Sequence, residues 1–121
     1  MDATAFGRIL ERVVNELPGA RGAVFVDWEG EAVDQFSHMS HTGIRLVGAH
    51  WGIIYHQVKM ALGKLTLGGP RELVLSFQRQ YVVVRRVTDE YLVIITMARE
   101  TNLGRALHLL DWAQGKLREE M

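Results

Sequence analysis

Cysteine is absent from the 121 residues of this chain. Its absence excludes disulfide bonds, thiolate nucleophiles and cysteine-based zinc sites, and it fits a reducing, cytoplasmic setting. A surplus of either charge is also absent, because 14 Lys and Arg residues balance 14 Asp and Glu residues. Binding to nucleic acid needs a basic surface that neutralises several phosphates. We therefore expect no nucleic-acid partner.

Long hydrophobic runs and targeting signals are lacking as well. The apolar runs are no longer than a β-strand, so we expect no membrane insertion. The first residues, Met1-Asp2-Ala3-Thr4, have neither the basic nor the apolar region of a secretory signal. No internal repeat or linker divides the chain. We expect a single domain over residues 1–121, which can bury roughly two-thirds of its unfolded surface without a metal or a disulfide.

Hydrophobic periodicity predicts three helices and five strands. The helices are expected at residues 4–17, 42–65 and 102–117, and the strands at residues 22–28, 31–37, 71–78, 80–88 and 91–98. The caps and stops are expected at Asp2 and Pro18-Gly19 for the first helix, at Gly68-Gly69-Pro70 for the long helix, and at Thr101 or Asn102 for the last helix. The pair Glu29-Gly30 is expected to form a hairpin turn.

The character of the strands places them in a sheet. Residues 91–97 are apolar at both even and odd positions, which is typical of a strand in the middle of a sheet. Residues 31–37 are more polar, so we expect them at an edge. The predicted fold is α/β, of the α+β type, in the order α-β-β-α-β-β-β-α. Its five-stranded, mainly antiparallel sheet has the long helix on one face and the two terminal helices on the other.

The long helix carries two apolar stripes instead of one. One wide stripe suffices to pack on the sheet, and it comprises Ile44, Val47, Trp51, Ile54, Val58, Leu62 and Leu65. Leu46, Ile53 and Met60 are spaced seven apart and fall nearly opposite, with Ala49 beside them and His50 and Gln57 at the flanks. A surface helix normally has one apolar face, so the second stripe indicates a partner. A second copy of the same helix is the simplest one.

Other interpretations of this helix stay open at this point. The three residues of the second stripe could be ordinary exposed hydrophobics, or residues 36–43 or a terminus could fold over them. Gly48 and Gly52 lie on a further side of the helix and each costs about 1 kcal/mol relative to alanine. Close approach of the backbone, to the sheet or to a partner, would explain that cost.

The polar residues do not form a recognisable catalytic or metal-binding pattern. The histidines at 38, 41, 50, 56 and 108 lack the spacing of a helical metal pair, and we interpret those before the long helix as solvated. Asp27, Glu29 and Glu31 gather at the first hairpin, where a solvated tip is expected. Arg85 and Arg86 put one cation on each face of a strand, and one of them could reach the exposed end of the sheet or the acidic surface of a partner. We expect no catalytic residue, metal or cofactor.

Three segments, taken in order, resemble Roadblock domains, the family of the dynein light chain Roadblock. Leu17 to Gly30, which reads LPGARGAVFVDWEG, looks like the first hairpin of that family. Asp89-Glu90-Tyr91-Leu92-Val93-Ile94 resembles the entry of its last hairpin, and Asn102-Leu103-Gly104-Arg105-Ala106 is similar to the opening of its last helix. The resemblance covers nearly the whole chain. Trp51, Trp112 and the histidine-containing residues 36–43 depart from the family pattern.

The resemblance implies a homodimer in a profilin-like Roadblock architecture. Its long helices would pack antiparallel, and the strands at residues 71–78 would join edge to edge. The expected dimer interface comprises Leu46, Ala49, His50, Ile53, Gln57, Met60, Leu73, Leu75 and Phe77. Members of the family commonly bind or regulate small Ras-like GTPases, as the bacterial MglB-type proteins do, or serve as scaffolds.

Three functional hypotheses follow, in order of preference. The first is a homodimeric, non-enzymatic regulator or scaffold for a small Ras-like GTPase. The second is a structural dimerisation or adaptor module that has no effect on nucleotide turnover. The third is a ligand-sensing or enzymatic domain that would use His38, His41 or the acidic hairpin.

Overall fold

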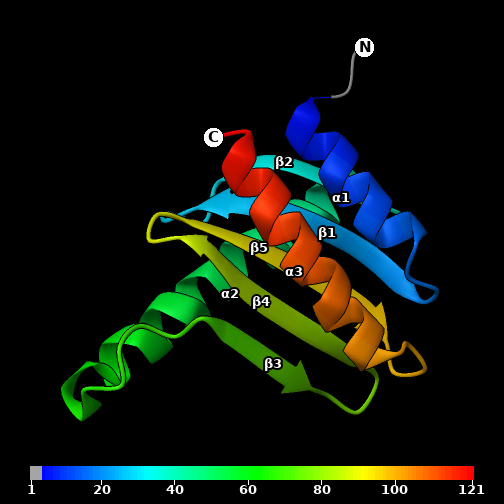
Figure 1. The fold of residues 1–121 in the computed structure, drawn as a ribbon. Helices are drawn as coiled ribbons and strands as arrows, with labels where there is room; N and C mark the ends of the chain where they lie inside the picture. The colour runs from blue at the N-terminus through cyan, green and yellow to red at the C-terminus, as the bar shows by residue number, and fades with distance from the viewer. Residues whose placement is uncertain (1–3) are drawn as a thin grey trace.

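A computed structural model describes residues 4–121, which form three layers around one sheet (Figure 1). The elements follow the expected order: α1 (Ala5–Asn15), β1 (Ala20–Asp27), β2 (Ala32–Ser37), α2 (His41–Ala61), a 3-10 turn η1 (Gly63–Leu65), β3 (Glu72–Ser76), β4 (Gln80–Thr88), β5 (Tyr91–Ala98) and α3 (Leu103–Glu119). The sheet has the strand order β2-β1-β5-β4-β3, and every neighbouring pair is antiparallel. The predicted α+β architecture is confirmed.

The two faces of the sheet carry different helices. Helices α1 and α3 lie on one face, and α2 crosses the other (Figure 1). Phe25 and Val93 belong to the core under α1 and α3, whereas Val24 and Ile94 belong to the core under α2. Because helices cover both faces, successive residues of β1, β4 and β5 are buried. This explains why those strands appear in the sequence as continuous apolar runs.

The strand positions agree with their sequence patterns. Strand β5 is central and β2 is an edge strand, as predicted. Strand β3 forms the other edge. The Glu29-Gly30 turn is present, and Gly30 has a φ of 85°, a conformation that glycine adopts without the steric cost of a side chain. Asp27 stabilises the turn by accepting hydrogen bonds from the backbone amides of Glu29, at 2.9 Å, and Glu31, at 3.0 Å.

The terminal helices begin at polar caps. Thr4 caps α1, with its hydroxyl oxygen accepting from the Gly7 amide at 2.9 Å; Asp2, the cap expected from the sequence, lies outside the described residues. Asn102 caps α3, with its side-chain oxygen accepting from the Arg105 amide at 3.0 Å. Each cap supplies an acceptor to a backbone amide that has no partner within the helix.

Helix α2 ends earlier than the sequence indicates. It begins after Ser40, whose hydroxyl oxygen accepts from the Gly43 amide at 2.9 Å, and it stops at Ala61 instead of Leu65. Leu62 and Leu65, which were expected to pack on the sheet, are exposed. The C-terminal end of α2 runs out past the sheet (Figure 1). Because the sheet does not extend beneath this end of the helix, the α-helix gives way to the 3-10 turn η1 well before Gly68-Gly69-Pro70.

Gly48 and Gly52 allow α2 to lie close to the sheet and the first hairpin. A Cβ on Gly48 would lie 2.7 Å from Val26 Cγ1, and a Cβ on Gly52 would lie 3.2 Å from the Cα of Gly30. The close approach left open by the sequence is therefore an approach within the chain. It holds the turn of the first hairpin against the middle of α2.

Replacing Gly48 with alanine is expected to lower the free energy of unfolding by about 1–2 kcal/mol, because the new Cβ would overpack against a stiff valine. Gly115→Ala is the matched control, since it is also within a helix and has no atom within 4 Å of an added Cβ. Helix propensity alone should then raise the free energy of unfolding by about 1 kcal/mol. Denaturant unfolding measures both variants, and changes of the same sign would contradict the packing.

Among residues 4–121, no helix combines the length and the apolar character that a membrane span requires.

Candidate protein-interaction surface

The outward side of α2 is an exposed row of large apolar side chains. Leu46, Ile53 and Met60 expose 52%, 54% and 82% of their surface. At 100° per residue they lie nearly opposite Ile44 and Tyr55, which are buried against the sheet. The predicted second stripe is therefore present, and within the chain it is open to solvent. No part of residues 36–43 covers it enough to bury it.

The polar flanks of this row are exposed on the same helix. His50 and Gln57 both face solvent. His50 Nδ1 donates to the carbonyl oxygen of Leu46 at 2.9 Å, because a carbonyl oxygen only accepts hydrogen bonds.

Ala49 has a different position from its neighbours in the row. It is half-buried, and a Cβ on Gly30 would lie 3.3 Å from the Ala49 Cα. Its backbone therefore lies against the turn of the first hairpin in the same chain. Trp28, in that turn, is 57% exposed.

The edge strand β3 extends the apolar surface beyond the helix. Leu73 pairs with Val84 and Leu75 with Val82 in the β3–β4 ladder. Both leucines are half-buried and pack on the core under α2. Phe77, just after the strand, is 42% exposed, and its ring centroid lies 5.7 Å from that of Trp51. Helix α2 and the edge of the sheet are thus joined by apolar contacts.

A buried arginine anchors β3 to α3. The Arg85 guanidinium donates to Glu72 of β3 at 2.8 Å, to Asp111 at 2.7 Å and to Gln114 at 3.2 Å, the last two residues lying in α3. Only 7% of the Arg85 side chain is exposed. The expectation that one of the two arginines could reach a partner does not fit Arg85, whose donors are engaged within the chain. Arg86 pairs with Asp89 at 2.6 Å.

The start of β3 is also tied to α2. The Tyr55 hydroxyl donates to the carbonyl oxygen of Pro70, which lies just before the strand. Burial raises the pKa of Tyr55 above its ordinary value, so the phenol keeps its proton and remains a donor at neutral pH. The edge strand is therefore held from both faces of the sheet.

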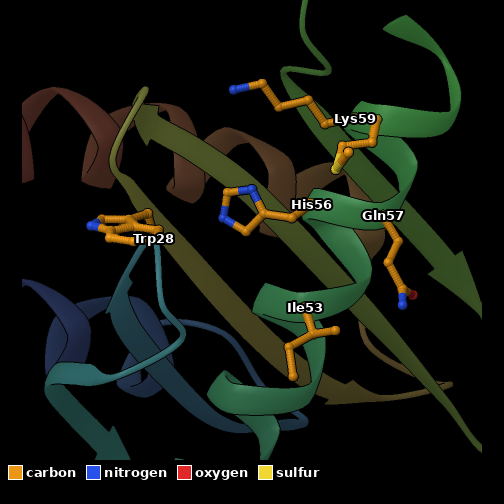
Figure 2. A pocket seen from close by; sticks show the side chains of 6 residues that line it. Trp28, Ile53, His56, Gln57 and Lys59 are labelled. Atoms are coloured by element: carbon orange, nitrogen blue, oxygen red, sulfur yellow. The ribbon is translucent and has the colours of Figure 1, made fainter.

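A groove runs along α2 between the apolar row and the first hairpin (Figure 2). It has a volume of about 640 Å³, and its lining residues are Trp28, Ile53, His56, Gln57, Lys59 and Met60. In Figure 2 the indole of Trp28 and the imidazole of His56 face each other across the groove. His56 Nε2 is buried and has no hydrogen-bond partner in the described part of the chain.

Sequence reasoning missed this groove because it placed Trp28 inside a strand. Residues 22–28 were interpreted as one buried run, but β1 ends at Asp27 and leaves Trp28 in the turn. The signal that was available is the position of a tryptophan between Asp27 and Glu29, since two charged neighbours are typical of a solvated turn.

The residues weighed for metal or acid–base chemistry lie apart. Within residues 4–121, no three His, Asp or Glu side chains are arranged to hold a metal ion. His41 contacts Gln35 at 3.1 Å and Arg45 at 3.4 Å. Glu29 and Glu31 are exposed. What α2 and its surroundings offer instead is an exposed apolar row, a groove beside it and an edge strand.

Comparison with known proteins supports the fold through structure and not through sequence. No profile of a known protein family matches the chain, and no curated protein matches it in sequence. Its structure is similar to a Roadblock/LC7 domain from Streptomyces avermitilis, with a TM-score of 0.86 and 13% identity over 93% of this chain and 94% of that one. It is also similar to Myxococcus xanthus MglB, with a TM-score of 0.85 and 11% identity over 98% of this chain and 96% of that one. For MglC from the same organism the TM-score is 0.70 and the identity is 24%, over 98% of this chain and 100% of that one. The chain folds as a Roadblock-type domain.

Proposed function

We propose that this protein is a non-enzymatic homodimer that regulates or scaffolds a small Ras-like GTPase. The observation that carries the proposal is the exposed row of Leu46, Ile53 and Met60 on a Roadblock-type fold. Each of these side chains gains roughly 1.5–3 kcal/mol when it is fully buried. Leu46 and Ile53 are already half covered in the single chain, so a second copy that covers the row recovers about half of that free energy at these two positions and most of it at Met60.

The homodimer uses helix α2 and the edge strand β3. The proposed interface comprises Leu46, Ala49, His50, Ile53, Gln57, Met60, Leu73, Leu75 and Phe77. Two antiparallel α2 helices bring the rows together, with His50 and Gln57 at the rim. Strand β3 has an unpaired edge, and the same strand in the partner satisfies its backbone groups. Leu73 and Leu75, half-buried in one chain, become covered from the partner's side.

The GTPase partner is proposed from the family resemblance together with the shape of the dimer. Roadblock domains such as MglB act with small Ras-like GTPases, and the present chain has their fold. A dimer built on α2 presents a composite surface to which both protomers contribute. A single GTPase can contact both copies there.

The test uses a Ras-like GTPase encoded in the same genome. It is loaded with GDP or with a non-hydrolysable GTP analogue, and its binding to the full chain is measured by calorimetry. Hydrolysis is then measured in a single turnover with and without the protein. We expect binding together with a changed hydrolysis rate. Binding with an unchanged rate would support the adaptor function instead, and lack of binding to every such GTPase would remove the GTPase part of the proposal.

A further inference from the structure

A hollow opens near the first turn of α1 and the end of α3, on the face of the sheet opposite α2. Its volume is about 300 Å³, and its lining residues are Phe6, Phe25, Val33, Tyr91 and Met121. Figure 1 shows the start of α1 and the end of α3 at the same end of the molecule. The hollow is at the small end of the range for ligand pockets. Because it is on the other face of the sheet from the apolar row of α2, the proposed dimer leaves it accessible.

Three aromatic rings lie next to one another in this hollow. The ring centroids of Phe6 and Phe25 are 5.2 Å apart, and those of Phe25 and Tyr91 are 5.4 Å apart. Phe25 is 1% exposed and so lies at the bottom, whereas Phe6 and Tyr91 are half-buried beside it. A cation within about 6 Å of a ring centroid is attracted by the negative charge of the ring face. Rings at this spacing can act together on one cation.

Two of the three rings have a carboxylate as their direct neighbour on the adjacent strand. Asp34 of β2 is the register partner of Phe25, and Asp27 of β1 is the register partner of Tyr91. Residues directly opposite each other on antiparallel strands share one face of the sheet, with Cβ atoms about 4.5–5.5 Å apart. A Cβ on Gly7 of α1 would lie 3.0 Å from Asp34 Oδ2, so this carboxylate is on the α1 side. The rings and the two negative charges are therefore on the same face.

These two carboxylates have no cationic partner within the described chain. Residues 22–44 and 87–98 include no Lys or Arg, and no ion pair among residues 4–121 involves Asp27 or Asp34. Asp27 accepts from the two backbone amides of the hairpin turn. Asp34 accepts from the Thr4 hydroxyl and, at 2.8 Å, from the Gln35 amide. These bonds hold the carboxylates in place and do not neutralise them.

We propose that this hollow binds a small organic cation through a quaternary ammonium group. The rings supply the cation–π attraction, and Asp27 and Asp34 supply the opposite charge. The methyl groups of a quaternary ammonium suit the apolar side chains of Val33 and Met121, and the group has no N–H donor to leave unpaired. The inference is independent of the proposed dimer and GTPase, because it concerns the other face of the sheet.

The first test compares choline with its neutral isostere, 3,3-dimethylbutan-1-ol. Each is titrated into the isotope-labelled full chain, and the amide signals are followed by nuclear magnetic resonance. We expect choline to bind at least about tenfold more tightly, with the largest shifts at Phe6, Val33 and Tyr91. Equal affinity for the two probes, shifts confined to the groove beside Trp28, or no shift with choline would each overturn the proposal.

The second test removes one ring and keeps its apolar bulk. Phe6→Leu should weaken choline binding about fivefold, because leucine lacks the π face. Phe36→Leu is the matched control, since Phe36 is also half-buried against the same core but does not line the hollow. Its affinity for choline should be unchanged, and thermal melting verifies that both variants are folded. Unchanged affinity in folded Phe6→Leu would mean that the rings do not hold the cation.

The third test removes one charge. Asp34→Asn keeps an acceptor oxygen for Thr4 and Gln35 and loses the negative charge, so choline binding should weaken about threefold. Glu100→Gln removes an exposed carboxylate just beyond the other end of β5, and it should bind choline as the natural chain does. Equal affinities for Asp34→Asn and the natural chain would overturn the part of the carboxylate.

A last arm identifies the source of the cation. The rings lie in a hollow whose bottom is the fully buried Phe25, which favours a free cation over a headgroup fixed in a membrane. The chain should therefore not sediment with phosphatidylcholine vesicles under conditions in which it binds choline. Sedimentation with the vesicles that Phe6→Leu abolishes would overturn the free cation and assign the site to a lipid headgroup.

Discussion

Replacing Ile53 with aspartate is expected to convert the protein from dimers into monomers or aggregates. Ile53 is in the middle of the apolar row and is 54% exposed in the single chain. In the dimer, each copy would place a carboxylate in a dry interface where it has no partner, and an unpaired buried charge is strongly unfavourable. The dissociation constant should rise by about a hundredfold or more, which corresponds to about 3 kcal/mol. Light scattering after size-exclusion chromatography measures the change.

Val33→Asp is the matched control for this variant. Val33 is a β-branched residue of similar exposure, at 44%, but it is in strand β2 at the opposite edge of the sheet from β3. It should keep the mass of the natural protein. If Ile53→Asp remains a dimer of unchanged affinity, the outward face of α2 is not the interface.

Replacing Arg85 with alanine is expected to lower the free energy of unfolding by about 3 kcal/mol. The guanidinium is 7% exposed and bridges Glu72 and Asp111. Its removal leaves Glu72, whose side chain is 24% exposed, partly buried without a counter-ion. The loss should lie toward the lower end of the range for buried pairs, because Asp111 is 70% exposed and remains hydrated. Urea unfolding followed by circular dichroism gives the value.

The neighbouring arginine provides the control. Arg86 is 38% exposed and pairs with Asp89, which is 81% exposed. An exposed pair of this kind contributes up to about 1 kcal/mol, so Arg86→Ala should cost far less than Arg85→Ala. Equal losses at the two positions would mean that the bridge between β3 and α3 contributes little to stability.

Features set by local sequence could be predicted well. The strands expected at residues 80–88 and 91–98 are β4 and β5 as observed. Their apolar runs end at the short polar segments Gln78-Arg79 and Asp89-Glu90, and such turn signals depend on neighbouring residues only. The order of elements, the central position of β5 and the division of the helices between two faces followed from the same patterns.

Features that depend on distant contacts could not be predicted. The ion pairs of Arg85 join residues 13 and 26 positions apart, and a sequence does not show which of several carboxylates a strand arginine will meet. The early end of α2 depends on where the sheet stops beneath it. The exposure of Trp28 depends on where β1 ends, and boundaries are the least predictable part of an element.

The candidate surface was predictable in part for the same reason. The spacing of Leu46, Ile53 and Met60 is a property of one helix, and their exposure follows from it. The groove beneath Trp28 needs the hairpin to lie against Gly48 and Gly52, so it required the fold. The partner that covers this surface is a second molecule, and the pattern of one helix does not specify it.

The rate at which peroxide oxidises Met60 tests the central claim most directly. In a lone chain Met60 is 82% exposed and Met121 is 50% exposed, so peroxide should oxidise Met60 faster than Met121. We predict the opposite order in concentrated protein, with Met60 slower than Met121, and a return to fast oxidation on dilution or in Ile53→Asp. Mass spectrometry of the peptides resolves the two sites. Faster oxidation of Met60 than of Met121 at every concentration would show that the outward face of α2 stays wet.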